Sequence, residues 1–106
     1  MSQYGLSGDT IDSIRKVFQS FTELEEVVLY GSRAMGNYKK GSDIDIALKG
    51  QELDLHFLNR ISLGLDDLML PYTFDISIYR HIDSEELLDH IRRRGIVLYR
   101  SVQLPD

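Results

Sequence analysis

Two aspartates separated by a single residue are the first feature of this sequence that could do chemistry. Asp43 and Asp45 flank Ile44 in a segment that alternates acidic and apolar residues. In an extended strand this alternation places both carboxylates on one face, roughly 6.5–7 Å apart. Aspartate is depleted in strands, and two like charges so placed oppose each other's ionisation unless a cation lies between them. The pair could therefore serve two metal ions in a phosphoryl-transfer site.

A third acid, Asp75, lies in another strand-like segment, between Phe74 and Ile76. A single aspartate in a strand more often belongs to a solvated face. If the strand of Asp75 pairs beside residues 43–48 in the expected register, however, the three carboxylates form one cluster. Asp43, Asp45 and Asp75 are therefore the candidate metal-ligating and catalytic residues.

Gly31 and Ser32, which directly follow an apolar segment, could form a phosphate-binding turn. Glycine lets a backbone approach a phosphate closely, and the N–H groups that follow it can form an anion-binding nest. The serine hydroxyl adds a donor for a phosphate oxygen. A Gly-Ser pair after a strand is by itself more often an ordinary turn.

The segment from Gly31 to Asp45 resembles the signature of the DNA polymerase β-type nucleotidyltransferase superfamily, which is Gly-Ser, ten residues, then Asp-x-Asp. Ten residues separate Ser32 from Asp43. Chance would give this pattern in about one chain of this length in a thousand. A wider similarity to the minimal nucleotidyltransferases of bacteria and archaea covers residues 9–100, including the third aspartate.

The resemblance implies a role for each of these residues. Gly31 and Ser32 would bind the triphosphate of a nucleoside triphosphate, expected to be ATP. Asp43 and Asp45 would ligate two Mg²⁺ ions. Asp75 would complete the metal site and help to deprotonate the acceptor hydroxyl.

Basic residues between these motifs are further candidates. Met35 departs from the family pattern, because we expect its position to be often basic in relatives. Arg33, Lys39 and Lys40 could compensate by facing the phosphates, or they could be solvated cations of a loop. Residues 31–49 carry four cations against two acids, and one locally basic loop in an acidic chain suits a compact phosphate ligand.

Helices that could position these residues follow from apolar side chains at helical spacing. This spacing predicts helices over about residues 9–20 and 52–68. Asp83 and Glu86 have the spacing of a capping box at the start of a third helix, which Gly95 can end.

Strands are predicted where residues alternate or are β-branched. Residues 31–42, rich in glycine and serine, should be mostly loop, with room for one short helical turn. The chain, residues 1–106, is expected to form one α/β domain with a small mixed β-sheet and helices on one face, as in the polymerase β-like nucleotidyltransferase fold. The predicted strands are residues 26–30, 43–48, 73–79 and 96–99.

Composition excludes several classes of protein. The 106 residues are 42% hydrophobic and 27% charged, which is typical of a globular domain. With no cysteine, the sequence excludes disulfides and thiolate metal sites. No apolar segment approaches the ~18 residues of a membrane span, and the expected location is the cytoplasm. The net charge of −5 disfavours extended nucleic-acid binding.

The sequence offers little for recognising an acceptor, so the acceptor groove is expected to be completed by a partner, by a second copy of the chain or by the acceptor macromolecule itself. The resemblance suggests a helical HEPN protein in a hetero-oligomer, neutralised when AMP is added to one of its tyrosines, so that this chain acts as the antitoxin. One alternative is a vestigial binding module that neutralises its partner by steric occlusion. Another is a transferase of small molecules. The three histidines, His56, His81 and His90, are expected to have structural roles.

Overall fold

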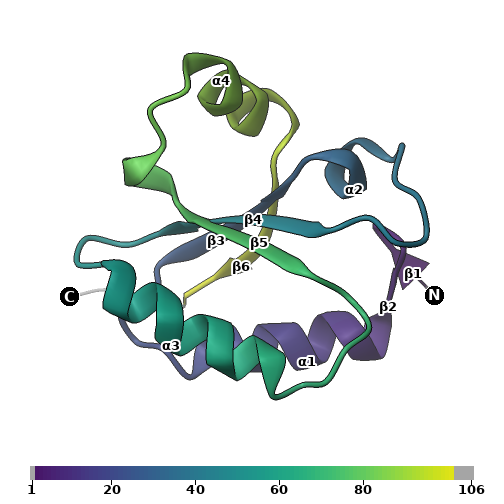
Figure 1. Ribbon diagram of the computed structural model, residues 1–106, viewed down its shortest axis with the longest axis horizontal. Helices are drawn as coiled ribbons and strands as arrows, with labels where there is room; N and C mark the ends of the chain where they lie inside the picture. Colours follow the sequence, from purple (N-terminus) through teal and green to yellow (C-terminus); the bar gives the residue numbers. More distant parts are fainter. Residues whose placement is uncertain (1, 102–106) are drawn as a thin grey trace.

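A four-stranded sheet organises the computed structural model, which describes residues 2–101 (Figure 1). The strand order is β5-β4-β3-β6. Strand β3 (Glu26–Tyr30) pairs antiparallel with β4 (Ile44–Lys49) and with β6 (Ile96–Arg100). Strand β4 pairs parallel with β5 (Phe74–Ile78). The predicted small mixed sheet is therefore confirmed.

Two long helices cover one face of this sheet, below it in Figure 1. They are α1 (Gly8–Gln19) and α3 (Leu55–Asp66), whose N-terminal amides are capped by the side chains of Ser7 and Asp54. Helix α3 forms the crossover that parallel β4 and β5 require. The main core lies between these helices and the sheet and includes Phe18, Leu24, Leu29, Ile44, Ile46, Phe57 and Ile61.

Helix α4 (Glu85–Arg94) lies against the opposite face. Successive strand residues point to opposite faces, so Val28, Tyr30 and Ala47 form a second apolar cluster with Ile91 of α4. The prediction of helices on one face thus describes α1 and α3, and α4 adds a smaller layer on the other. The same alternation also places the acidic residues of β4 and β5 on this second face, which they share with α4.

The start of α4 corrects one sequence prediction. The N-cap is Ser84, whose hydroxyl accepts from Leu87 N, and not Asp83. Between β5 and α4 the chain forms a short 3₁₀ helix, η1 (Tyr79–His81). The helix therefore has a different capping residue from the one that the Asp83–Glu86 spacing suggested.

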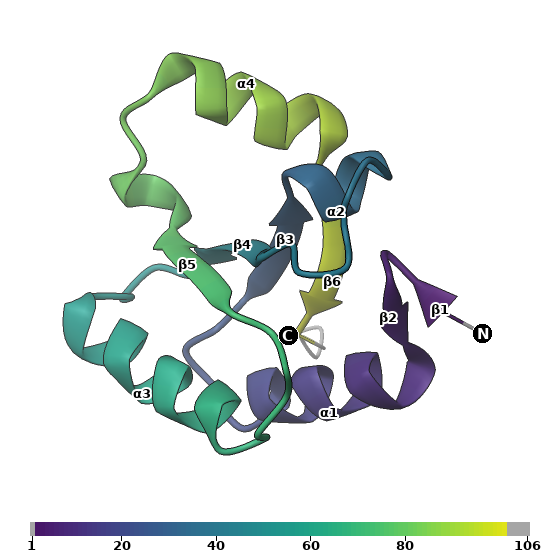
Figure 2. The ribbon, with the colours of Figure 1, turned by 45° about the vertical axis from the view of Figure 1, so that its right-hand side comes forward.

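Two elements near the start of the chain had no sequence signal. Strands β1 (Ser2–Gln3) and β2 (Leu6–Ser7) form a hairpin beside the start of α1 (Figure 2). Its turn, Tyr4-Gly5, has positive φ angles of 59° and 76°. The short helix α2 (Ser32–Met35) is the helical turn expected within residues 31–42.

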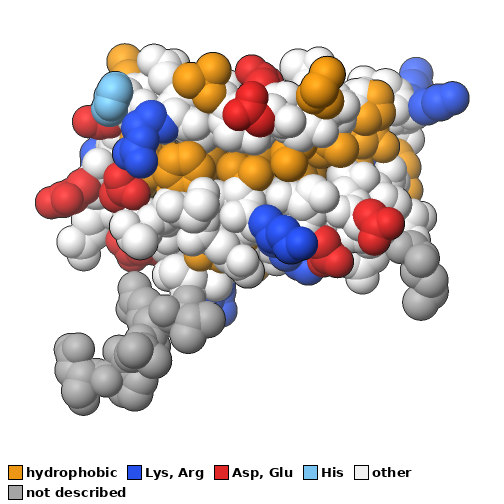
Figure 3. Space-filling model, turned by 90° about the horizontal axis from the view of Figure 1, so that it is seen from below, with side chains coloured by type: hydrophobic (Ala, Val, Ile, Leu, Met, Phe, Trp, Pro, Cys, Tyr) orange, Lys and Arg blue, Asp and Glu red, His pale blue; other side chains and the backbone are white. Residues whose placement is uncertain are grey.

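Seen from below, an apolar band runs across the face that α1 and α3 form (Figure 3). Within residues 2–101, no helix combines the length and the apolar character needed to span a membrane.

Candidate nucleotide and metal site

Neighbouring strands bring two of the three predicted acids together. In the parallel register Asp45 of β4 is the direct partner of Asp75 of β5, and across the antiparallel pair Asp45 lies opposite Tyr30. Adjacent strands lie about 4.8 Å apart. Ile44 and Ile46 face the main core, so alternation places Asp45 and Asp75 on the face that carries α4.

Asp43 lies one residue before β4 and is exposed, so the strand begins later than predicted. The pKa of Asp45 is raised, first by partial burial and then by the negative charges of Asp75 and Asp43. The charge of Arg33 acts in the opposite direction. The three acids therefore interact electrostatically around Asp45.

Gly31 directly follows β3 and lies beside Asp45. Its φ of 76° and ψ of −156° lie in a region that essentially only glycine occupies. A Cβ at this position would also clash with Asp45 Oδ2. Helix α2 begins at the next residue, Ser32. The Gly31-Ser32 turn, which we define as these two residues, therefore lies directly against an acid of the predicted metal site.

Arg33 is not placed as the sequence suggested, because it is only 2% exposed. Its Nε and Nη2 donate to Ser42 O over 3.1 and 2.8 Å, and its Nη1 donates to Tyr4 O over 2.9 Å. The rings of Tyr38 and Tyr72 lie 5.4 and 4.9 Å from the guanidinium carbon. The guanidinium thus ties the loop to the N-terminal hairpin, and this arrangement leaves it little surface for a phosphate.

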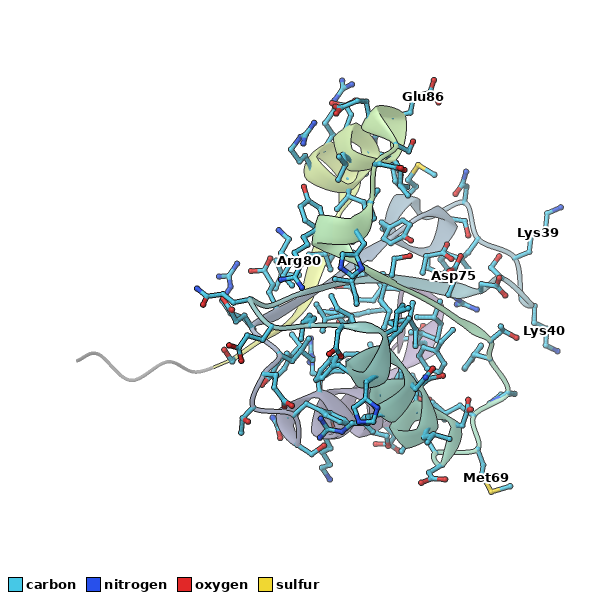
Figure 4. The ribbon with its side chains drawn as sticks, turned by 60° about the vertical axis from the view of Figure 1, so that its left-hand side comes forward. Lys39, Lys40, Met69, Asp75, Arg80 and Glu86 are labelled. Atoms are coloured by element: carbon cyan, nitrogen blue, oxygen red, sulfur yellow. The ribbon has the colours of Figure 1, made fainter. Side chains whose placement is uncertain are left out.

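Lys39 and Lys40 are exposed in the loop between α2 and β4. Figure 4 shows both side chains extending outward on the side of the molecule where Asp75 lies. Ser42 closes the tip of this loop, because its Oγ accepts from Lys39 N over 2.8 Å. A phosphate contact by either lysine stays a prediction.

His90 contributes to the site in a way that sequence reasoning missed. Gly31 N donates to His90 Nε2 over 2.9 Å, across 59 positions of sequence. The imidazole also packs edge-on against Tyr30, with ring centroids 6.1 Å apart. No spacing among the histidines signals this contact, because it depends on how α4 folds back onto β3.

The acids suit Mg²⁺ by their chemistry and their charge. Within the described part of the chain, no group of three or more His, Cys, Asp or Glu side chains is placed to hold an ion by itself. Mg²⁺ commonly binds through one or two carboxylates, keeps several waters and takes substrate phosphates as further ligands. The paired carboxylates of Asp45 and Asp75, with Asp43 nearby, fit this all-oxygen pattern.

Three features together define a class of nucleotide-binding domain. They are this sheet order, an Asp-x-Asp at the start of a central strand and a Gly-Ser turn beside it. Residues 12–103 match the family described as polymerase beta, nucleotidyltransferase. The chain belongs to this family. None of the curated proteins compared with the chain matches it.

Several solved structures share the fold. A crystal structure of a toxin–antitoxin with AMP-PNP matches at a TM-score of 0.70 and 24% identity, over 86% of this chain and 73% of that chain. The MntA-HepT toxin–antitoxin matches at 0.65 and 21%, over 90% and 74%. A tri-AMPylated Shewanella oneidensis HEPN toxin in complex with MNT antitoxin matches at 0.64 and 21%, over 87% and 71%. At these identities the similarity establishes the fold alone.

Proposed function

We propose that this chain is a magnesium-dependent adenylyltransferase that moves AMP from ATP onto a hydroxyl group of a partner protein. The observation that carries the proposal is the pairing of Asp45 with Asp75 across β4 and β5, directly beside the Gly31-Ser32 turn. Membership of the nucleotidyltransferase family supports the reaction class. The neighbouring complex with AMP-PNP supports an adenine nucleotide as the substrate.

In this proposal each residue of the site has a role that follows from its position. Ser32 donates its hydroxyl to a phosphate oxygen, and the turn lets the triphosphate approach the backbone. Asp43, Asp45 and Asp75 would hold two magnesium ions, which would neutralise the charge that develops on the phosphates. Asp75, exposed on the outer strand β5, is open to an incoming hydroxyl.

The reaction would exchange one phosphorus–oxygen bond for another. The acceptor oxygen forms a bond to the α-phosphorus, the bond from that phosphorus to the bridging oxygen of the β-phosphate breaks, and pyrophosphate leaves. The proton of the acceptor hydroxyl passes to Asp75. Fixing acceptor and phosphate in line contributes through orientation, an effect that can reach several kcal/mol.

The acceptor that we propose is a tyrosine of a HEPN protein, which this chain would neutralise as an antitoxin. Three structural neighbours are toxin–antitoxin structures, and one of them contains an AMPylated HEPN toxin with an MNT antitoxin. The partner would bring its hydroxyl to the exposed edge of the sheet at Asp75.

Transfer of label tests this function. The chain is incubated with Mg²⁺, a candidate HEPN protein and ATP labelled at either the α- or the γ-phosphorus. We expect label from the α-position alone, on a tyrosine of the partner. The Asp43→Asn, Asp45→Asn double variant should transfer none, whereas Asp66→Asn with Asp67→Asn, at the exposed end of α3, should be unchanged.

The same experiment distinguishes the binding-module alternative. A chain that neutralises its partner only by covering it would protect the partner in a toxicity or nuclease assay without transferring label. It would also protect equally well as the Asp43→Asn, Asp45→Asn variant. That combination of results would contradict the enzymatic proposal.

A further inference from the structure

The hydrogen bond between Gly31 and His90 links the proposed nucleotide site to a helix far away in sequence. We propose that His90 is a positioning residue for this site: its imidazole holds the Gly31-Ser32 turn in the shape that receives the phosphates. The inference rests on the proposed function. It adds α4 to the elements that build the site.

The geometry of Gly31 shows why this turn needs an external support. The residue has a φ of 76° and a ψ of −156°, outside the regular helix and strand regions. Its carbonyl is fixed by Met35 N, which donates to Gly31 O over 3.1 Å within α2. Its amide donates to His90 Nε2. The N–H and the carbonyl of Gly31 are therefore both hydrogen-bonded.

This bond also refines the simple picture of a phosphate nest at the turn. The Gly31 N–H is already donated to an imidazole nitrogen 2.9 Å away. It cannot at the same time make a full hydrogen bond to a phosphate oxygen. Gly31 therefore serves the site by its backbone shape and its close approach to Asp45, and His90 holds that shape.

Packing fixes the imidazole in turn. Its ring meets the ring of Tyr30 at an interplanar angle of 77°, and Tyr30 is the residue before Gly31. The next residue of α4, Ile91, is buried against Val28 and Ala47. A ring held by β3 on one side and by its own helix on the other can place Nε2 at a fixed point above the turn.

The hydrogen bond of His90 can be tested separately from the packing of its ring. Nε2 can accept only in the neutral imidazole that carries its proton on Nδ1. A glutamine side chain can offer an amide oxygen near the position of Nε2, whereas phenylalanine keeps a ring against Tyr30 but has no acceptor. Comparing the His90→Gln and His90→Phe variants therefore separates the contribution of the hydrogen bond from that of the ring's packing.

The experiment measures binding of the magnesium complex of AMP-PNP to the full chain by calorimetry. We expect His90→Phe to weaken binding about two- to tenfold, the range for one neutral hydrogen bond. His90→Gln should bind within about twofold of the unsubstituted chain. His56→Phe, an exposed histidine on α3, is the matched control and should leave the affinity unchanged.

A second measurement needs no substitution at His90. Long-range ¹H–¹⁵N spectra of the unsubstituted chain should show the His90 Nδ1–H tautomer, with Nε2 unprotonated. The Gly31 amide resonance should move in His90→Phe and move less in His90→Gln. A proton on Nε2 at neutral pH would overturn the inference, even if the variants failed to fold.

The remaining outcomes separate this inference from the function on which it rests. If the unsubstituted chain binds the nucleotide and His90→Phe binds it equally well, only the positioning role is overturned. Equal losses in His90→Gln and His90→Phe would also overturn it, because the acceptor would then be irrelevant. If the unsubstituted chain binds no magnesium nucleotide, the proposed function fails and the inference fails with it.

Discussion

Among single residues, Asp45 combines partial burial with two neighbouring acids. Burial raises its pKa first, and the charges of Asp75 and Asp43 raise it further. A carboxyl whose pKa is higher in the folded than in the unfolded protein stabilises the fold at pH values below the unfolded-state pKa. This stabilisation is lost as the pH rises through the folded-state pKa. At neutral pH the ionised cluster therefore opposes folding, and a bound cation would remove that penalty.

Replacing the acid pair should separate stability from activity. In the Asp43→Asn, Asp45→Asn variant the carboxylate repulsion around Asp45 is removed, so the unfolding temperature measured with a chelator present should be unchanged or higher. Transfer of label from ATP should be abolished. Calorimetry at pH 7 and at pH 4 provides the check, since the difference between the two proteins should shrink at the lower pH. A folded variant with undiminished transfer would contradict the catalytic assignment.

A pair of glycines allows the shape of the turn to be tested. Gly31 and Gly36 both have positive φ angles, 76° and 86°, so alanine at either should destabilise the fold by about 1–3 kcal/mol. A Cβ at Gly31 meets Asp45, whereas one at Gly36 meets no atom within 4 Å. We therefore expect Gly31→Ala to lose nucleotide binding by calorimetry and Gly36→Ala to keep it. Equal affinities would show that the contact with Asp45 is irrelevant to the site.

Single residues also show where sequence reasoning succeeds and where it stops. Asp43, Asp45 and the Gly-Ser turn are recognisable because their spacing along the chain is itself the signal. Asp75 is assigned correctly to a strand, and pairing of that strand with β4 then brings it to Asp45. The contacts of His90 and Arg33 join residues 59 and 29 positions apart, which no local pattern encodes.

At the scale of elements, hydrophobic spacing predicted the long helices and the four sheet strands to within a few residues. The β1–β2 hairpin was missed because strands of two residues are too short to show alternation. The side taken by α4 was missed because an apolar stripe does not specify which face of a sheet it covers. Both omissions matter for the site, since the hairpin holds Arg33 and α4 carries His90.

Arg33 should stabilise the loop and hairpin without contacting the substrate. In Arg33→Met the carbonyls of Tyr4 and Ser42 lose their donors, and the free energy of unfolding should fall by about 1–3 kcal/mol in denaturant titrations. Lys39→Met, in the exposed part of the same loop, should change it by less than about 0.5 kcal/mol. If both variants unfold alike, the buried hydrogen bonds do not hold the loop.

The start of α4 offers a second test of an element. Ser84→Ala removes the hydroxyl that caps Leu87 N and should lower stability by about 1 kcal/mol. Asp83→Ala removes the acid that the sequence pattern favoured and should have a smaller effect. Chemical denaturation of the two variants compares them directly. A larger loss in Asp83→Ala would restore the capping box that the sequence suggested.

In the molecule as a whole, the three acids lie on the side of the sheet that α4 covers. The sheet ends there at β5, an outer strand with Asp75 exposed. Lys39 and Lys40 extend into solvent on the same side (Figure 4). An acceptor can therefore reach the acids from outside without any rearrangement of the core.

This openness predicts that the chain needs its partner for rapid transfer. A surface site can bind a magnesium nucleotide but does little to fix a small alcohol in line with the α-phosphorus, so the isolated chain should label small hydroxyl compounds only slowly. Binding of the HEPN protein would hold its tyrosine in place, and such positioning can change a rate by several orders of magnitude. Time courses with α-labelled ATP, with and without the partner, measure the difference.

The control is a partner whose candidate tyrosine is changed to phenylalanine, which should bind the chain in a pull-down but accept no label. Ordinary enzymatic rates on a small alcohol or sugar by the chain alone would contradict the partner requirement and favour a transferase of small molecules.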